Sequence, residues 1–208
     1  MVRFGLIGYP IGHSSSPKLF SKACGGRFEY DLIETPDFDR AWRTFIEGPY
    51  RAVNVTAPFK ALAAAAADIR SAEVERTGAA NILIKTPDGV KAHNSDYLGV
   101  KAILSHLTGQ SVAVIGTGGA GRAARAAAED LGLTVRSYHH DEIKDGVCAD
   151  IIIYTLPCAV PGIELLDAPV LMEANYRDPV LSGHAGYIPG TVWHKAQADE
   201  GYPLMLGR

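Results

Sequence analysis

The sequence has 208 residues, of which 47% are hydrophobic and 21% charged, and its formal net charge is −3 at pH 7 with a pI near 6.1. This is the composition of a globular protein with one large domain or two small ones, and it favours neither a nucleic-acid nor a membrane partner. The most apolar run, residues 61–67, is too short to cross a bilayer, and the first residues lack the layout of a signal peptide. Three cysteines without metal-ligand spacing favour reduced thiols, so we expect a cytoplasmic protein.

The first half of the sequence alternates short apolar runs with helical stretches. In chain order we predict a strand at 4–8, a helix from 17, a strand at 28–34, a helix at 36–45, a strand at 52–56, a helix from 58, and a hairpin of strands 80–85 and 89–94. Strands that alternate with helices are typical of an α/β fold with a mainly parallel sheet.

Two helix starts in this half follow the rules for capping residues. Ser16 is expected to cap one helix, with Pro17 at its first position, and Thr56 to cap another, with Pro58 at its first position. Lys60 then falls in the first turn of the second helix, where the positive end of the helix dipole disfavours a cation. A lysine that simply reaches solvent is one explanation. We favour a functional one, because local rules are typically broken at functional sites.

The second half begins a new strand–loop–helix unit after a connecting helix at 98–107. The predicted elements that follow are a strand at 111–115, a helix at 120–131, strands at 134–138, 149–155 and 170–176, and a helix within 189–206. Residues 116–121 (GTGGAG) join the first of these strands to the alanine-rich helix. Glycines in this context allow a tight turn and a close approach to a pyrophosphate, which the helix N-terminus then binds. A plain strand–helix turn is the alternative, but the context favours nucleotide binding by Gly116, Gly118, Gly119 and Ala120.

The residues expected to bind the adenosine ribose are unusual. Such folds place them about 20 residues after the glycine loop, and here the strand ends at His139 and His140, followed by Asp141 and Glu142. A carboxylate at this place is typical of NAD and an arginine of NADP, so these residues leave the coenzyme open. Two histidines can contact a phosphate, whereas the two acids would oppose one. The histidine pair also suggests a metal site, but no third ligand occurs nearby and we expect no metal.

Polar side chains of the first half gather where predicted strands begin or end. They are Ser14, Ser16, Thr56, Lys60, Asn81, Asn94, Ser95 and Asp96. In an open α/β sheet, ligands bind at the carboxyl ends of the strands. Each residue alone fits a helix cap equally well, but together the hydroxyls, amides and one Lys–Asp pair suit a small polyhydroxylated acid.

Five motifs occur in the order found in shikimate dehydrogenases, and the sequence therefore resembles that family. They are residues 8–17 (GYPIGHSSSP), 54–60 (NVTAPFK), 78–81 (GAAN), 94–99 (NSDYLG) and 116–121 (GTGGAG). The resemblance extends over the whole chain through residues 149–157 (ADIIIYTLP), 173–176 (EANY) and 190–207 (GTVWHKAQADEGYPLMLG).

The resemblance implies a two-domain α/β protein. A substrate-binding domain at residues 1–97, to which a C-terminal helix at 190–208 returns, would precede a Rossmann-like dinucleotide-binding domain at 98–189. The implied activity is the reversible, NADP-dependent reduction of 3-dehydroshikimate to shikimate in aromatic amino acid (chorismate) biosynthesis. The partner is then a small-molecule substrate, and the protein is a monomer or a homodimer.

The resemblance also implies roles for individual residues. Lys60 and Asp96 would be the catalytic pair that transfers a proton. The implied substrate-binding residues are Ser14 and Ser16 for the carboxylate, Thr56, Asn81 and Gln197 for ring hydroxyls or carboxylate, and Tyr176 near the carboxylate. The implied coenzyme-binding residues are Gly116, Gly118, Gly119, Ala120, His139, His140, Thr155 and Gly190.

Several positions depart from the family pattern. Residues 139–141 replace an asparagine–arginine–threonine sequence, Phe20 replaces a common histidine, Leu206 replaces a usual threonine, and the chain is shortened between 179 and 190. These changes keep NAD as an alternative coenzyme. They also leave two alternative functions, an NAD-dependent quinate/shikimate-type dehydrogenase and a catalytically silent metabolite- or nucleotide-sensing relative. Lys60 and Asp96 argue against the sensor, because a sensor needs no proton donor.

Overall fold

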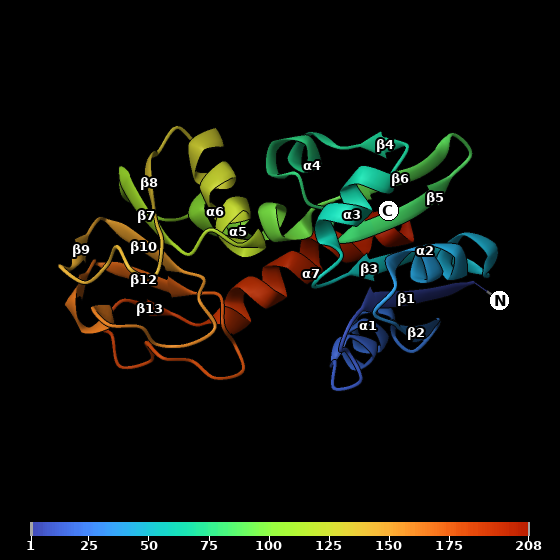
Figure 1. Ribbon diagram of the computed structural model, residues 1–208, viewed down its shortest axis with the longest axis horizontal. Coiled ribbons are helices and arrows are strands. Elements are labelled where there is room, and N and C mark those ends of the chain that lie inside the picture. Colours follow the sequence, from blue (N-terminus) through green and yellow to red (C-terminus); the bar gives the residue numbers. More distant parts are fainter. Residues whose placement is uncertain (1, 208) are drawn as a thin grey trace. The chain divides into compact units, whose positions relative to one another are not determined.

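The structure is a computed structural model that describes residues 2–207. The chain folds into two compact units (Figure 1). Unit 1 comprises the residues up to Ser95 together with those from Gly201 onward, and unit 2 comprises Asp96–Glu200. Across the described residues, no helix combines the length and the apolar character needed to cross a membrane.

Unit 1 is built on one six-stranded sheet. Its strands are β1 (Arg3–Gly8), β2 (Glu29–Glu34), β3 (Tyr50–Val55), β4 (Ile69–Arg70), β5 (Ile82–Thr86) and β6 (Gly89–His93), in the order β2-β1-β3-β5-β6-β4. The strands β1, β2 and β3 are parallel, and β5 and β6 form the antiparallel hairpin expected from the sequence. The predicted α/β class with mainly parallel pairing is confirmed.

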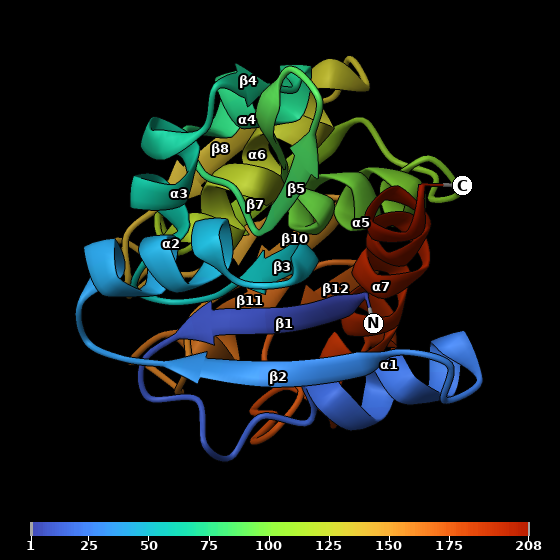
Figure 2. The same ribbon diagram turned by 90° about the vertical axis from the view of Figure 1, so that its right-hand side faces the viewer.

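Helices cover both faces of this sheet (Figure 2). They are α1 (Ser16–Cys24), α2 (Phe38–Glu47), α3 (Lys60–Ala66) and α4 (Ala72–Thr77). Alternate strand residues point to opposite faces. Ile7, Val53 and Leu83 pack with α2, α3 and α4, whereas Phe4 and Ala52 pack with α1 and with Met205 near the C-terminus.

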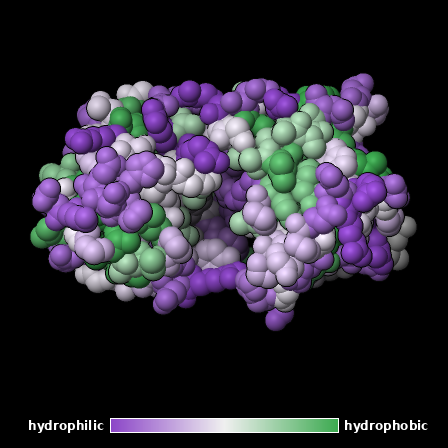
Figure 3. All heavy atoms as spheres, in the orientation of Figure 1, coloured by the Kyte–Doolittle hydropathy of each residue, from purple (hydrophilic) through white to green (hydrophobic). Residues whose placement is uncertain are grey.

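The helix α3 is small enough to lie close to the sheet. Ala63 and Ala64 face the core, while Leu62 remains 49% exposed. Apolar side chains therefore gather over α3 on the face shown in Figure 3. Because alanine side chains are short, the first turn of α3, with Lys60, is held near the end of β3.

Two predicted helix starts in unit 1 are wrong in detail. The helix α3 begins at Lys60 with Phe59 as its N-cap, so neither Thr56 nor Pro58 has the predicted role. The Thr56 backbone N–H donates to the Ile7 carbonyl at 2.9 Å, which keeps Thr56 with the strand, and a turn through Pro58 precedes the helix.

The start of α1 also differs from the prediction. The helix begins at Ser16 itself with Ser15 at the N-cap, and Ser15 makes no capping side-chain bond. The Ser16 backbone N–H instead donates to Ser14 Oγ at 3.2 Å. The Ser14 hydroxyl oxygen therefore accepts a hydrogen bond from the N-terminus of α1, as the side chain of a capping residue would.

Unit 2 is a five-stranded parallel sheet with one small additional strand pair. Its strands are β7 (Ser111–Ile115), β8 (Thr134–Tyr138), β10 (Ile151–Tyr154), β12 (Val170–Glu173) and β13 (Tyr187–Ile188), in the order β13-β12-β10-β7-β8, and β9 (Val147–Cys148) pairs with β11 (Leu166–Asp167). The helices are α5 (Ser95–Leu104), α6 (Gly119–Asp130) and α7 (Gly190–Leu206), with a short 3-10 turn, η1 (Ile163–Leu165).

The two faces of the unit 2 sheet are covered differently. On one face Val112, Val114 and Ile153 pack with α5, α6 and Trp193 of α7. On the other face Ala113 and Ile152 pack with residues from the segment 143–181, which holds the β9–β11 pair and η1. Turns and short strands thus take the place of helices on this second face.

Candidate active site

In unit 1, the serines after β1 form a polar pair at the start of α1. The Ser14 hydroxyl donates to Ser16 Oγ at 3.0 Å, and both side chains are partly exposed. Two adjacent hydroxyls at the carboxyl end of a strand can donate to the two oxygens of one carboxylate. The structure therefore brings together the two residues predicted to bind a carboxylate.

Tyr30 of β2 connects this pair to β3, which lies two strands away in the sheet. Its hydroxyl donates to Asn54 Oδ1 at 2.8 Å and also contacts Ser16. Burial raises the pKa of Tyr30 well above its usual value, the neighbouring Tyr202 adds to the increase, and the Ser16 contact opposes it. Tyr30 stays protonated, so it remains a donor to Asn54. No local pattern in the sequence points to Tyr30, because the registers of β1 with β2 and with β3 bring it to Asn54.

Asn81, the residue directly before β5, is hydrogen-bonded to both Asn54 and Ser95. Its backbone carbonyl accepts from Asn54 Nδ2 at 3.4 Å, its Nδ2 donates to Ser95 Oγ at 3.1 Å, and its Oδ1 accepts from the Ser95 backbone N–H at 2.7 Å. Asn81 is 4% exposed and Ser95 2%. The Asn81 side chain therefore satisfies a backbone group at the start of α5, which explains why this helix begins before the predicted residue 98.

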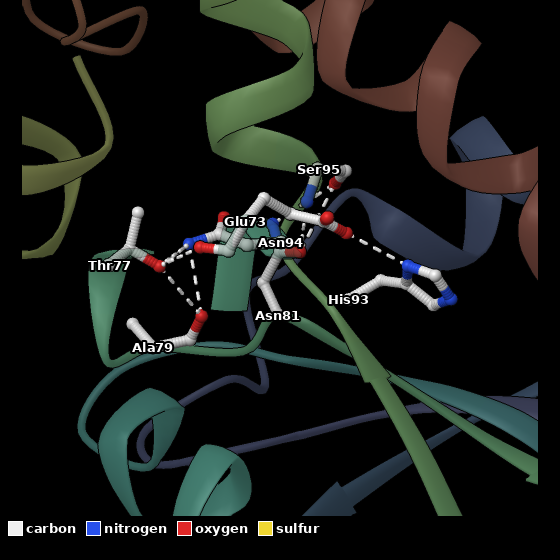
Figure 4. Close-up of polar contacts among 7 residues, drawn as sticks. All are labelled: Glu73, Thr77, Ala79, Asn81, His93, Asn94 and Ser95. Carbon is white, nitrogen blue, oxygen red and sulfur yellow. Dashed lines mark hydrogen bonds and ion pairs between the residues drawn. The ribbon is translucent and has the colours of Figure 1, made fainter. Parts of the chain in front are cut away.

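A second pair of contacts holds α4 against the end of β6 (Figure 4). Glu73 Oε1 lies 2.9 Å from His93 Nδ1, and Asn94 Nδ2 donates to Thr77 Oγ1 at 2.9 Å. Burial is the largest single influence and disfavours the Glu73 carboxylate, but the hydrogen bonds to that carboxylate, the one from His93 first, and the charge of His93 together outweigh burial and lower the pKa of Glu73 to about 2. These contacts fix the segment that carries Asn81, and no local sequence pattern indicated them.

Thr56 and Lys60 follow β3, as predicted. A Cβ on Gly8 would lie 2.4 Å from Thr56 Cγ2, so the end of β1 approaches Thr56 as closely as a glycine allows. The Lys60 carbonyl accepts from the Ala80 backbone N–H at 2.9 Å, which holds the start of α3 beside the segment that leads into Asn81. Lys60 is half-buried. Unit 1 thus gathers Ser14, Ser16, Thr56, Lys60 and Asn81 around the carboxyl ends of β1 and β3 and the start of β5.

In unit 2, the glycine loop lies between β7 and α6. Gly116 has φ +101°, a conformation that favours glycine, and a Cβ on Gly121 would lie 1.9 Å from the Gly116 carbonyl oxygen. A Cβ on Gly118 or Gly119 would meet nothing within 4 Å. Gly116 and Gly121 therefore allow the tight turn and the close packing of α6 against β7. Gly118 and Gly119 leave the open space that a pyrophosphate needs at the first turn of α6, beside Ala120.

The other predicted coenzyme residues lie around this loop. Thr155 Oγ1 donates to the Ile115 carbonyl at 2.8 Å, so Thr155 lies beside Gly116 at the same sheet edge. At the end of β8, His139 Nδ1 lies 3.4 Å from Thr117 Oγ1. The next residue, His140, is exposed.

Both an acid and an arginine lie near His139. The Glu142 carboxylate accepts from the His139 backbone N–H at 2.6 Å, so one of its oxygens is already engaged by the turn. Arg122, in the first turns of α6, donates to the Thr117 carbonyl at 3.4 Å and is exposed. The sequence analysis missed Arg122, although an arginine directly after a glycine loop is a usable signal for a phosphate contact.

The remaining predicted residues of unit 2 lie along the first half of α7 and against it. Trp193 Nε1 donates to the Asp96 carbonyl at 3.0 Å, and a Cβ on Gly99 would lie 2.6 Å from the Gln197 backbone nitrogen. The helices α5 and α7 therefore touch at two places, Trp193 against Asp96 and Gln197 against Gly99. A Cβ on Gly190 would lie 2.7 Å from the Ala174 carbonyl oxygen, which makes Gly190 a close-packing residue.

Tyr176 follows this packed segment and carries a histidine against its ring. Tyr176 is 37% exposed and stacks on His194, with ring centroids 4.4 Å apart and an interplanar angle of 27°. The sequence analysis did not select His194. Among the described residues, no group of three or more histidine, cysteine, aspartate or glutamate side chains is arranged to hold a metal.

Comparisons with known proteins agree on one family. A family model described as "Shikimate dehydrogenase substrate binding domain" matches residues 6–83. A protein named shikimate dehydrogenase (NADP(+)) from Halobacterium salinarum is 36% identical over 182 residues, covering 83% of this chain and 68% of that protein. One of the same name from Anaeromyxobacter dehalogenans is 30% identical over 214 residues, covering 93% of this chain and 75% of that protein.

Solved structures show the same fold. The crystal structure of Mycobacterium tuberculosis shikimate dehydrogenase matches with a TM-score of 0.80 at 26% identity, covering 100% of this chain and 94% of that chain. A Thermus thermophilus shikimate 5-dehydrogenase, solved in complex with NADP(H) and shikimate, matches with a TM-score of 0.81 at 23% identity, again over 100% of this chain and 94% of that chain.

Proposed function

Because the chain belongs to the shikimate dehydrogenase family, we propose that it catalyses the reversible, NADP-dependent reduction of 3-dehydroshikimate to shikimate in aromatic amino acid biosynthesis. The observation that carries the proposal is the hydrogen-bonded network from Ser14 and Ser16 through Tyr30 and Asn54 to Asn81. Paired hydroxyls beside buried amides suit a ligand that has one carboxylate and several hydroxyl groups.

In this proposal the side chains of unit 1 hold most of the substrate. Ser14 and Ser16 donate to the carboxylate, and Thr56 and Asn81 bind ring hydroxyls. The Asn81 side chain suits this role because its hydrogen bonds to Ser95 fix its orientation before the substrate arrives. Gln197 and Tyr176 of unit 2 add contacts to a hydroxyl and to the carboxylate.

Lys60 and Asp96 are proposed as the catalytic pair. When bound, NADPH supplies the hydride that the ketone carbon accepts, and NADP⁺ takes it back in the reverse direction. Lys60 donates a proton to the ketone oxygen as that oxygen becomes a hydroxyl, and accepts one in the reverse direction. Asp96 orients the Lys60 ammonium group for this transfer. The unfavourable place of Lys60 at the start of α3 is consistent with a functional role.

The residues of unit 2 fit a dinucleotide coenzyme. The open space at Gly118 and Gly119 and the free backbone amides at the start of α6 suit a pyrophosphate. Gly116, Ala120, Thr155 and Gly190 complete the proposed site.

We infer NADP rather than NAD from the charges at the ribose end. Arg122 and His139 both contact Thr117, so a 2′-phosphate beside them would meet the Arg122 guanidinium together with hydrogen-bonding groups of His139 and Thr117. His140 is the next exposed side chain in this region. The relatives described above carry NADP(+) in their names, which supports the same choice.

We further propose that the protein works in the cytoplasm as a monomer or a homodimer. None of Cys24, Cys148 and Cys158 takes part in a disulfide, which suits a reducing compartment.

The test is the initial rate of shikimate oxidation, followed by the absorbance of reduced nicotinamide, with NADP⁺ and NAD⁺ in parallel and quinate as the second substrate. We expect turnover of shikimate with NADP⁺. Turnover mainly with NAD⁺ would support the dehydrogenase activity but contradict the proposed role of Arg122 and His139 in binding a 2′-phosphate. Turnover of quinate alone would change the substrate, and folded protein that turns over neither acid would overturn the proposed activity in favour of a sensing role.

A further inference from the structure

The indole of Trp193 makes a contact that the proposed mechanism does not use. Its Nε1 donates to the Asp96 carbonyl at 3.0 Å, across 97 residues of sequence. Both residues belong to unit 2, so the contact lies within one compact unit. The Trp193 side chain is 4% exposed and packs in a core cluster with residues of α5, α6 and β7. A buried and directional hydrogen bond therefore ends on the main chain of a proposed catalytic residue.

We propose that Trp193 is a positioning residue, which holds the main chain of Asp96 and thereby restricts where the Asp96 carboxylate lies within unit 2. The inference rests on the proposed function, because it needs Asp96 to act in catalysis. Trp193 itself touches neither substrate nor coenzyme in this role, and it acts only through Asp96.

The position of Asp96 in its helix explains why such a contact matters. Asp96 is the second residue of α5, and the ends of helices fray more readily than their interiors. The next residue, Tyr97, is held by its hydroxyl, which donates to Asp130 Oδ2 at the end of α6 at 2.7 Å. That bond does not act on the Asp96 peptide group, whereas the bond from Trp193 does. Because a carbonyl oxygen has two lone pairs, it can accept from the indole as well as from an N–H of α5.

The same contact sets how α7 lies against α5. One turn beyond Asp96, a Cβ on Gly99 would lie 2.6 Å from the Gln197 backbone nitrogen, so the two helices approach very closely there. Glycine has no side chain that could fix the rotation of one helix against the other. The bond from Trp193, one turn before Gln197, supplies that direction. Asp96 and Gln197, which are both proposed site residues, thus keep one arrangement within unit 2.

Core packing alone is the alternative explanation for a buried tryptophan. A buried indole usually finds a hydrogen-bond acceptor, whether or not that acceptor has a function. The two explanations predict different results for Trp193→Phe, which keeps an aromatic ring in the core and removes the N–H group. Packing predicts lower stability alone, whereas positioning also predicts slower turnover with unchanged binding of substrate and coenzyme.

The first experiment tests the contact without any turnover. The chain has two tryptophans, so the indole N–H signal that remains in Trp42→Phe belongs to Trp193. Trp42 is half-buried in α2. Because a buried, hydrogen-bonded N–H exchanges slowly, we expect the Trp193 proton to exchange with solvent at least about tenfold more slowly than that of Trp42. Equal exchange rates would show that the bond is absent and would overturn the inference, whatever the enzyme does.

The second experiment compares the kinetics of shikimate oxidation in the wild type, Trp193→Phe and a control, Trp42→Phe. We expect kcat to fall by about five- to tenfold in Trp193→Phe, as the loss of one hydrogen bond allows. KM for shikimate and Kd for NADP⁺ should stay within about twofold, because unit 1, the Gly99 contact and the glycine loop are unchanged. Trp42→Phe, the same change in unit 1, should alter none of these quantities.

Tyr97→Phe controls for a loss of stability. It removes a buried hydrogen bond from the same core cluster but leaves the Asp96 peptide group untouched. We expect it to lower the unfolding temperature about as much as Trp193→Phe does, while kcat stays within about twofold of the wild type. A fall of kcat in Tyr97→Phe equal to that in Trp193→Phe would show that Trp193 is merely structural.

A double-mutant cycle decides whether the effect passes through Asp96. In single turnovers of Asp96→Asn, adding Trp193→Phe should cost no more than about a further twofold, because the carboxylate to be positioned is already gone. A further loss of about five- to tenfold in that background, or an unchanged kcat in Trp193→Phe alone, would overturn the proposal.

If Trp193→Phe fails to fold, Trp193→Leu replaces it, because leucine also fills the core without an N–H group. A folded wild type that turns over no shikimate would contradict the proposed function, and with it the catalytic role of Trp193. An active enzyme whose kcat does not depend on Trp193 would contradict the inference alone.

Discussion

The two units present their polar groups by opposite means. In unit 1, polar groups from α1, from strands β2 and β3 and from the turn before β5 bind one another, as Ser16, Tyr30, Asn54 and Asn81 do. In unit 2, residues 116–121 carry almost no side chains and offer backbone amides in a space that glycines keep open. Unit 1 therefore depends on the presence of particular polar side chains, whereas unit 2 depends on the absence of side chains at its glycines.

The hydrophobic cores of the two units also differ, in what covers the faces of each sheet. Helices pack on both faces of the unit 1 sheet, but in unit 2 one face is covered by turns and short strands. A buried carboxylate organises part of that cover. Glu173 is fully buried and accepts hydrogen bonds from the Val180 backbone N–H and from the Tyr187 hydroxyl, each at 2.9 Å. Burial first, and then this bond to Glu173, raise the pKa of Tyr187 to about 12.

The largest expected effect on turnover comes from removing the ammonium group of Lys60 in unit 1. In Lys60→Ala we expect kcat to fall by about 10²- to 10⁴-fold, because the ketone oxygen loses its proton donor. Lys60 is the first residue of α3, where a cation is unfavourable and alanine is the best helix former, so the thermal unfolding temperature should stay level or rise. Stopped-flow single turnovers and a thermal melt measure the two quantities.

Lys22→Ala is the matched control for this substitution. Lys22 is exposed in the last turn of α1, and its replacement should leave kcat unchanged. If Lys60→Ala retained wild-type turnover, or lost turnover only because it unfolds, Lys60 would not be the proton donor.

The next largest effect, on stability, is expected from adding one methyl carbon to the glycine loop of unit 2. In Gly121→Ala the new Cβ would lie 1.9 Å from the Gly116 carbonyl oxygen, so α6 must move away from β7. We expect a loss of about 3 kcal/mol in the free energy of unfolding, measured by urea denaturation without coenzyme. Weaker coenzyme binding should accompany it.

Gly118→Ala separates folding from coenzyme binding. Gly118 has φ −70° and ψ −168°, which alanine adopts, and its Cβ would meet nothing within 4 Å. Its stability should stay near the wild type while NADP⁺ binding weakens, as measured by calorimetry. Equal denaturation curves for Gly121→Ala and Gly118→Ala would contradict the distinction between packing and ligand-facing glycines.

A smaller and pH-dependent effect is expected at the contact that fixes α4. The pKa of Glu73 is lowered from 4.5 to about 2 in the folded protein, so the unfolded chain binds more protons as the pH falls. The pair therefore stabilises the fold above pH 4.5, and this contribution is lost as the pH falls towards 2. It corresponds to up to about 3 kcal/mol.

In Glu73→Gln we expect lower stability at pH 7 and a flatter decline of stability on acidification, both measured by denaturant titration. Glu75→Gln is the control, because Glu75 is exposed and only reaches Arg70 at 3.9 Å, and it should change stability by less than about 1 kcal/mol. The same acidic decline in Glu73→Gln as in the wild type would show that Glu73 is not the group responsible.

Local sequence patterns predicted the longer elements well and the short ones poorly. The strand at 111–115, the helix after the glycine loop and the hairpin at 80–94 follow from continuous apolar runs, alanine content and a Pro-Asp-Gly turn. The helix α4 and the strands β4, β9 and β11 have two to six residues each. Segments of this length gain too little from propensity and exist only because tertiary partners pair with them.

Local sequence patterns were enough to identify most candidate polar residues and to assign each of them to a strand or a turn. Ser14, Ser16, Lys60 and Gly116–Gly121 could be selected from local spacing, because serine, proline and glycine patterns place turns and helix starts to within a few residues, although the N-caps of α1 and α3 differ from the prediction. Only the tertiary structure decided that Tyr30 meets Asn54, that Asn81 holds the start of α5, and that His194 stacks on Tyr176. Sheet register and helix crossing make these contacts, and both depend on residues far apart in the chain, which no local pattern contains.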